Sequence, residues 1–495
     1  MKTKKKITAM LLMAVMLLTL ACSSQTNNTK SGDNGGSEGI DEKIGAGSET
    51  PETDAYEFPE LDCGGSDFTF LNPIQDWGFY TDIVLESSTG EILDDAVYSR
   101  NGTIEEKFNV NLIEINFEIS EIEQKIKTTV LAGDDLYDAI YCPAYNSASI
   151  GALITQNLFC DLGAIGELQF DMPWWNQTIQ EECAIGNGNN VYFSVCDINI
   201  MDLQVPWCIY FDEDMMKNLD IALPYALVKE GKWTYDRLAE YAKAGAQLNG
   251  AADFKWDHDN AAIYGLTAWQ HGIGALLAAS GERYVSKDEE GNPYLSAETE
   301  RFFNACDKIM QITQETGVYQ SANDWPNPFN FQYIFRDGKA LLMIGELKAA
   351  DSLRNMDSTF GILPLPKYDE NQSRYYSSVT IQMPVLTIPV TNEDTHMAGI
   401  ILDAMAYLSY KNVTPIFFDV TMSQKRLRNE ESIEMLEIIK DSVVYDLGMA
   451  YGWSNTLYLA IRESLDNGKN TAVTTIEKNR EKIAIAIEKT MELVN

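Results

Sequence analysis

Short apolar runs that alternate with amphipathic segments between residues 67 and 142 constrain the fold of this chain more than any other feature. Three runs rich in β-branched and aromatic residues predict strands: "DFTFLN" at 67–72, "VNLIEINF" at 110–117 and "LYDAIYC" at 136–142. Two segments with apolar residues at helical spacing lie between them: 94–109 and 118–133. The second predicted helix ends at Gly133, a residue typical of helix ends. This order predicts an α/β fold with a mostly parallel sheet.

A second α/β region follows in the middle of the chain. The same patterns predict further strands at 190–198, 203–211, 339–345, 359–366 and 382–390. Helices are predicted at 234–248, with Thr234 as N-cap, and at 297–316. The end of the chain is predicted to be helical at 394–411, 412–424, 430–442, 455–466 and 470–493. About 430 residues outside the N-terminal segment are enough for two lobes.

The first 21 residues have the pattern of a signal peptide. Four lysines precede the apolar run Ile7–Leu20, whose roughly 14 residues fit a signal sequence and are short for a membrane span. Ala21-Cys22 closes the run, as in bacterial lipoprotein signals, so Cys22 is predicted to carry the lipid. A plain secretory signal with an incidental cysteine is the alternative.

Residues 22–62 form a different kind of segment. From 23 to 54 the chain is rich in Gly, Ser, Thr, Asn and acid and has no aromatic residue, and such a composition cannot form a packed core. We interpret 22–62 as a flexible linker whose root-mean-square reach is about 35 Å.

The charge and the cysteines exclude several classes of function. The chain has 74 acidic and 37 basic residues and a net charge of −37, which argues against binding nucleic acid or anionic membrane surfaces. Seven cysteines follow Cys22, an odd number without a CxxC motif, and several lie in apolar runs that suggest buried free thiols. The only histidines, His258, His271 and His396, are far apart, so no metal site is expected. No cofactor is expected either.

Five longer segments, in order along the chain, carry a resemblance to a known family. They are "LAGDDLYDAIY" (131–141), "MPWWNQTIQEECAIGNGNNVYFSVCDIN" (172–199), "IYFDEDMMKNLDIALPYALVKEGKWTYDRLAEYAKA" (209–244), "IFRDGKALLMIGE" with "FGILPLPK" (334–346, 360–367) and "TIPVTNEDTHMAGIILDAMAYLS" (387–409). Through them the chain resembles the extracellular solute-binding lipoproteins of ABC importers, of the carbohydrate type found in Firmicutes. The resemblance covers the chain from about Asp67 to its end.

The resemblance implies a two-lobed α/β fold of the periplasmic-binding-protein kind (type II), with a ligand cleft between the lobes. Lobe 1 would comprise 63–172 and 366–411, and lobe 2 would comprise 173–365 and 412–495. The implied function is capture of a small solute, a sugar or oligosaccharide, for the permease subunits of an ABC transporter. The protein would act as a lipid-anchored monomer on the outer face of the membrane, without catalysis.

Two alternatives stay open. The first is a secreted glycan-acting hydrolase, although the sequence has no GxSxG, HExxH or GxxxxGK[ST] motif. The second is a surface binding lipoprotein that is not coupled to transport.

A sugar site needs aromatic faces that stack on pyranose rings and planar polar groups that bond hydroxyls. The candidates near predicted strand ends and lobe crossings are Trp77, Tyr145, Asn146, Trp174, Trp175, Asp197, Asn199, Trp269, Glu346 and Trp453. Adjacent residues seldom point the same way, so one of Trp174 and Trp175 is expected to face the cleft and the other to pack inward. Glu346 stands where relatives carry an aromatic residue in a Gly-x-Trp pattern. Trp207 and Trp233 are assigned to packing.

Overall fold

The computed structural model describes residues 56–75, 78–145, 150–254, 260–324, 330–380, 383–422 and 430–494. The described chain forms one compact unit that begins at Glu57. The predicted signal peptide, Cys22 and most of the predicted linker lie outside the described residues.

The first sheet is built from the N-terminal strands and one late strand. Its strands are β1 (Ser66–Ile74), β2 (Val110–Glu118), β3 (Ala139–Pro143) and β11 (Pro384–Thr387), in the order β11-β3-β1-β2. β1 pairs in parallel with β2 and with β3, whereas β11 runs antiparallel to β3. The prediction of a mostly parallel first sheet is therefore confirmed. Two helices connect these strands, α1 (Ile92–Phe108) and α2 (Ile122–Ala132), and Gly133 ends α2 in the left-handed conformation, at φ 77°.

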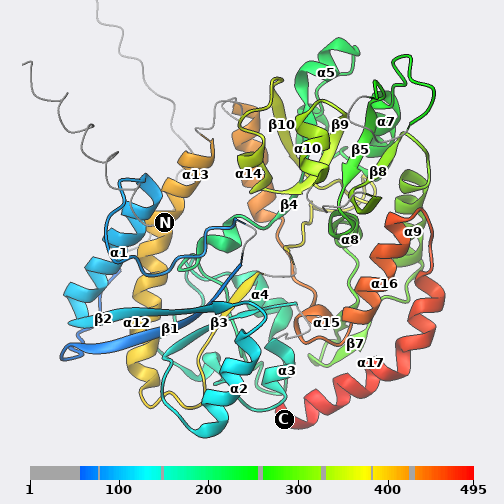
Figure 1. The fold of residues 1–495 in the computed structure, drawn as a ribbon. Coiled ribbons are helices and arrows are strands. Elements are labelled where there is room, and N and C mark those ends of the chain that lie inside the picture. The colour runs from blue at the N-terminus through cyan, green and yellow to red at the C-terminus, as the bar shows by residue number, and fades with distance from the viewer. Residues whose placement is uncertain are drawn as a thin grey trace, which may run out of the picture. The chain divides into compact units, whose positions relative to one another are not determined.

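The second sheet contains strands from the middle of the chain. They are β4 (Trp207–Asp212), β5 (Tyr264–Ala268), β8 (Tyr319–Ser321), β9 (Ala340–Glu346) and β10 (Phe360–Pro364), in the order β10-β4-β9-β5-β8. The helices that pack on this sheet or on one another beside it are α7 (Tyr235–Gly245), α8 (Gln270–Ala279), α9 (Glu300–Thr313), α10 (Asn330–Arg336), α14 (Glu430–Asp441), α16 (Asn455–Asp466) and α17 (Ala472–Val494). Thr234 caps α7 as predicted. Figure 1 shows the two sheets as separate parts of this unit.

The remaining elements lie outside the two sheets. They are α3 (Ile150–Ile154), α4 (Gln177–Cys183), α5 (Glu213–Asn218), α6 (Tyr225–Lys229), α11 (Ala349–Ser352), α12 (Thr395–Leu408), α13 (Thr414–Met422), α15 (Leu447–Ala450), the hairpin β6 (Val285–Lys287) and β7 (Pro293–Leu295), the 3₁₀ turns η1 (Leu162–Ala164), η2 (Ile200–Leu203) and η3 (Ala322–Asp324), and the π-helical turn η4 (Ser409–Val413). The predicted lobe boundary at 411/412 falls inside η4, and α13 beyond it packs against α1. The division into lobes otherwise stays a prediction.

One predicted strand is wrong. Residues 190–198 form only isolated bridges, in which Asn190 pairs with Ile185 and Ser194 with Leu386. Ser194 exchanges both backbone hydrogen bonds with Leu386 of β11, but its neighbours make no continuous ladder. The segment beyond it, including Cys196 and Asp197, instead lines a cavity.

Three chain segments lie side by side where the two sheets meet. Trp207 N, at the start of β4, donates to Ser378 O at 3.2 Å, and the Ser377 hydroxyl donates to Trp207 O at 2.6 Å. Ser377 N donates to Ser442 O at 2.8 Å, just after α14, and Val444 N donates back to Ser377 O at 2.9 Å. These connections precede β4, precede β11 and follow α14. We call them the crossing segments.

The residues that the sequence assigned to packing lie in the interior of the unit. Trp207 and Trp233 are buried, as predicted, and five of the seven described cysteines are buried, without a disulfide among the seven. Within the described residues, no helix is long and apolar enough to cross a membrane.

Candidate functional site

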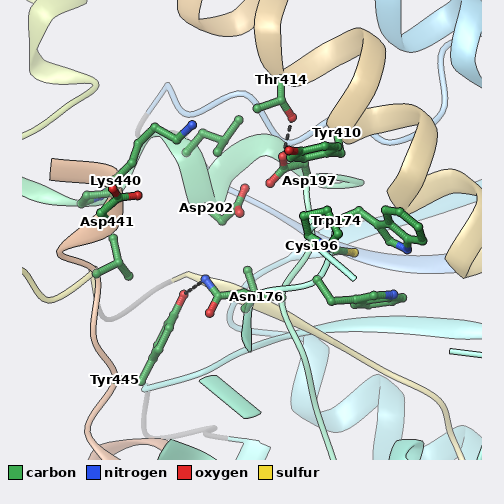
Figure 2. Close-up of a pocket in the computed structure, with 16 residues that line it drawn as sticks. Trp174, Asn176, Cys196, Asp197, Asp202, Tyr410, Thr414, Lys440, Asp441 and Tyr445 are labelled. Carbon is green, nitrogen blue, oxygen red and sulfur yellow. Dashed lines mark hydrogen bonds between the residues drawn. The ribbon is translucent and has the colours of Figure 1, made fainter. Parts of the chain in front are cut away.

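A cavity of about 270 Å³ lies against the crossing segments. Pro206, from the segment that leads into β4, and Val443, from the segment that follows α14, form part of its wall. Tyr410 and Thr414, from η4 and α13, line it from the side of the first sheet, and Lys440 lines it from the end of α14. Figure 2 shows Lys440 on one side of the cavity and Tyr410 with Thr414 on the other. The cavity therefore lies between elements that belong to different sheets.

Trp174 and Trp175 both line this cavity, and both are also anchored behind it. Their indole N–H groups donate to the same oxygen of Asp403, Oδ1, at 3.0 Å and 2.8 Å. The expectation that the two rings point to opposite sides is therefore wrong. A turn closed by a bond from Trp175 N to Met172 O at 3.1 Å brings both indoles to one carboxylate.

Asp403 is a buried carboxylate with its hydrogen-bonding capacity filled. It lies on α12 and is 1% exposed. Besides the two indoles, it accepts bonds from Gln169, through the backbone N–H at 3.1 Å and the side-chain amide at 2.9 Å. Four donors thus satisfy a charge that would otherwise be costly to bury. The Asp403 carboxylate therefore holds both tryptophans in place at the wall of the cavity.

Asp197 and Asp202 form a second carboxylate centre, at the surface of the cavity. The Thr414 hydroxyl donates to Asp197 Oδ2, and the carboxyl group of Asp202 lies beside that of Asp197. Burial raises the pKa of Asp197, while burial and the charge of Asp197 raise the pKa of Asp202 well above its usual range. Two carboxyl groups so close to each other disfavour each other's ionised form.

The lower part of the cavity is polar and held in place. Asn176 caps α4 by accepting a bond from Ile179 N at 3.1 Å, and its amide donates to the Tyr445 hydroxyl at 3.1 Å (Figure 2). Asn176 N donates to Val195 O at 3.0 Å, which ties the tryptophan turn to the segment that carries Asp197. Two parts of the chain therefore meet at one polar wall.

The other predicted residues lie outside this cavity. Tyr145 lines a separate cavity of about 30 Å³, which holds little more than a water molecule. Asn199 is 2% exposed, and both polar atoms of its side-chain amide bond within the protein. The oxygen accepts from Met201 N at 3.1 Å and the nitrogen donates to Asn72 at 3.2 Å. Trp77 and Asn146 lie outside the described residues.

Three further candidates belong to the second-sheet side of the unit. Trp269 precedes α8 and lies 4.1 Å from the ring of His271, measured between centroids. Glu346 ends β9, and burial raises the pKa of its carboxyl group to about 7. Trp453 stacks on Tyr451 and donates to Thr490 at 3.0 Å, so it packs within the core.

Sequence reasoning missed several polar lining residues. They are Asn176, Asp202, Tyr410, Lys440 and Tyr445. Asn176 and Asp202 stand within six residues of predicted site residues, so a wider window around Trp175 and Asp197 would have included them. No local signal marks the other three. Among the described residues, no three His, Cys, Asp or Glu side chains are grouped so that they could hold a metal ion.

Solved structures share this architecture over most of the chain. An ABC substrate-binding protein from Listeria monocytogenes in complex with cycloalternan has a TM-score of 0.55 and 12% identity, over 86% of this chain and 99% of that one. The chain has the fold of ABC-transporter solute-binding proteins. A cyclo/maltodextrin-binding protein complexed with maltotetraose matches at a TM-score of 0.52 and 13% identity, over 86% and 96% of the two chains. Maltose-bound MalE3 of T. maritima matches at 0.51 and 14%, over 85% and 100%.

The predicted two-lobed fold class is confirmed at this level. No family model matches the sequence, and no curated protein matches it either. The cavity at the crossing segments is lined by elements that belong to both sheets.

Proposed function

We propose that this protein captures a small carbohydrate in the cavity beside Trp174 and Trp175 and delivers it to the permease of an ABC importer. The observation that carries the proposal is the composition of that cavity. Trp174 and Trp175 line it together with Asp197 and Asp202. Aromatic faces stack on the apolar side of a pyranose, and carboxylates accept bonds from its hydroxyls. Sugars are bound in the solved structures that share the fold.

The place of the cavity supports a binding cycle by hinge closure. The crossing segments beside it lie where the two sheets meet, and Pro206 and Val443 of these segments line it. A ligand that contacts both sides would favour the closed arrangement, which a permease could distinguish from the open one. The volume of about 270 Å³ lies just below the usual range for ligand pockets, so we infer a mono- or disaccharide-sized solute.

The proposal includes the predicted placement of the protein in the cell. Lipid on Cys22 and the linker 22–62 would hold the binding unit at the outer face of the membrane, as a monomer. The permease subunits would be its protein partners.

The contact between Asp197 and Asp202 favours binding over hydrolysis. Glycosidases separate their two carboxyl groups by about 5–5.5 Å in retaining enzymes and by about 6.5–9.5 Å in inverting enzymes. Here the two carboxyl groups lie against each other, closer than in either class of enzyme. A glycan-acting hydrolase that uses this pair is therefore the weaker alternative.

A thermal-shift screen of free mono- and oligosaccharides, with a peptide panel beside it, tests the proposal. A sugar present at 100 times its Kd should stabilise the protein by about 2.7 kcal/mol. The same sugar should remain intact after overnight incubation. Stabilisation by peptides alone would overturn the carbohydrate assignment, and consumption of a sugar that binds would overturn the non-enzymatic one.

A further inference from the structure

The segment that leads from the predicted linker into the first strand is bound to α1 and β2. Cys63 N donates to Phe108 O at 2.8 Å, at the end of α1, and Gly65 N donates to Asn109 O at 2.7 Å. The side-chain amide of Asn109 donates to Asp62 Oδ1 at 2.8 Å. The first residues of most domains are poorly ordered unless such bonds tie them down. The chain is therefore held in place several residues before β1 begins.

Phe58 lies nearer to the predicted linker, and its ring contacts two helices. The centroid of the ring is 6.3 Å from that of Phe108, at the end of α1, and 6.3 Å from that of Tyr407, near the end of α12. The ammonium group of Lys107 lies 5.8 Å from the same centroid. Both distances are in the range of direct contacts with an aromatic ring. Phe58 is half-buried by these neighbours.

Tyr407 connects Phe58 to the tryptophan pair. Its ring meets the Phe58 ring edge-on, at 82°, and it meets the indole of Trp174 in the same way, at 79° and with the centroids 5.3 Å apart. Tyr407 stands one helical turn after Asp403, so both side chains lie on one face of α12. Asp403 Oδ1 accepts a bond from Trp174 Nε1 at 3.0 Å. The indole of Trp174 is thus held at two points of one helix.

The two contacts restrain Trp174 in different ways. The hydrogen bond to Asp403 fixes one atom of the indole, about which the ring can still tilt. The edge-on contact with Tyr407 limits that tilt. Tyr407 is itself half-buried, and Phe58 packs against it. A side chain that is already fixed in its binding conformation loses less conformational freedom when a ligand arrives, which favours binding.

We propose that Phe58 is a positioning residue for the sugar site, because it holds Tyr407 against Trp174 and so keeps the indole fixed at the cavity wall. The proposal rests on the proposed function and adds a residue to it that is not among the lining residues of the cavity. The sugar-binding unit then begins before β1. A chain that starts at residue 63 would fold around the same two sheets but present a looser indole to its ligand.

The first test needs no ligand. Acrylamide quenching of tryptophan fluorescence would be measured on the purified full chain and on Trp174→Phe, and the difference between them isolates the emission of Trp174. The same pair would be measured in the Phe58→Ala background. We expect the quenching constant of Trp174 to rise at least about twofold in that background, because the ring opens to solvent more often. An unchanged constant would overturn the proposal.

Sugar affinity is the second test. The sugar that binds most tightly in the thermal-shift screen would be titrated calorimetrically, at a temperature at which every variant is folded. We expect Phe58→Ala to weaken binding about three- to tenfold, because the indole must be ordered when the sugar binds. Phe58→Tyr keeps the ring and should bind within about twofold of the wild type. A loss of stability alone would not produce this difference between the two variants.

Phe303→Ala is the matched control. Phe303 is also half-buried, on α9, and its ring meets that of Phe302 edge-on with centroids 6.1 Å apart, but α9 does not line the cavity. This variant should lose stability and still change the sugar Kd and the quenching of Trp174 less than about twofold.

A double-mutant cycle tests the route from Phe58 to Trp174. In a Tyr407→Leu background, Phe58→Ala should change the sugar Kd less than about twofold further, since the connecting ring is already absent. An equal effect of Phe58→Ala in both backgrounds would overturn the route through Tyr407.

The outcomes separate this proposal from the proposed function. If Phe58→Ala binds the sugar as tightly as the wild type, or if Phe303→Ala weakens binding equally, Phe58 contributes only to stability, and carbohydrate capture stands without it. If Trp174 is more easily quenched in Phe58→Ala but no sugar binds in the screen, the packing of Phe58 is as described, whereas the proposed function and the role of Phe58 in binding are both wrong.

Discussion

Two carboxylate centres flank the tryptophan pair, and their contrast separates support from site. Behind the indoles, Asp403 is 1% exposed and accepts four N–H bonds. In front, Asp197 accepts a bond from the Thr414 hydroxyl, and the buried Oδ1 of Asp202 has no hydrogen-bond donor among the described residues. The hydrogen bonding of the Asp403 carboxylate is therefore complete, whereas that of the Asp202 carboxyl group is not. We infer that Asp403 holds the two indoles in place, whereas Asp197 and Asp202 are available to contact the proposed sugar.

The largest effect should come from removing either indole. Trp174→Ala and Trp175→Ala should each lower the free energy of unfolding by about 3–5 kcal/mol, because each deletes a buried ring and a bond to Asp403. Urea unfolding of the two variants measures this loss. Similar losses are expected, since both rings share one anchor. A large loss in one variant and none in the other would restore the picture of one packing ring and one free ring.

Asp403→Asn should have the next largest effect, about 2 kcal/mol of lost stability. The four N–H donors would then face a neutral amide with one acceptor oxygen instead of a charged carboxylate with two. In the Asp403→Asn background, Trp175→Ala should cost less than in the wild type, and a double-mutant cycle measures this coupling. Additive losses would show that the indole bond to Asp403 contributes nothing.

Asp202→Asn should have the smallest effect on stability, and of opposite sign. In the folded protein the pKa of Asp202 is raised well above its usual range, whereas in the unfolded chain it is about 3.9. Below that value both states hold the proton. As the pH rises above it, the unfolded chain ionises first, so the wild type loses stability until the folded group ionises.

Asp202→Asn should therefore be at least as stable as the wild type at pH 7.5, with a flatter dependence of unfolding free energy on pH above 4. Unfolding curves at pH 4.5, 6 and 7.5 measure this dependence. The wild-type slope should also contain contributions from Asp138 and Asp446, whose pKa values burial raises to about 6, and from Glu346. A variant that loses stability at pH 7.5 would make Asp202 a structural residue like Asp403.

The sequence predicted most elements because their patterns are local. The strands of the first sheet and the helices at the end of the chain carry apolar residues at the right period. β5 and α8 were missed because glycines interrupt their patterns. Gly265 is needed in β5, since a Cβ there would lie 1.9 Å from Ala242 O, and Gly274 packs against the Tyr458 ring.

The site was predictable only in part. Trp174, Trp175 and Asp197 drew attention through composition and position, and all three line the cavity. Their partners could not be predicted, because Asp403 lies 229 residues from Trp174 and Lys440 approaches from a different helix. The expected opposite orientation of the two indoles failed for the same reason. The bonds of both indoles to Asp403, which is distant in sequence, outweigh the local tendency of adjacent side chains to point in opposite directions.

A structure of the protein with the tightest-binding sugar from the screen tests the central claim most directly. We predict that the sugar lies in the cavity with its ring against an indole of the tryptophan pair and a donor on Asp202, while all four bonds to Asp403 persist. A sugar bound elsewhere, with this cavity empty and Asp202 unchanged, would contradict the account.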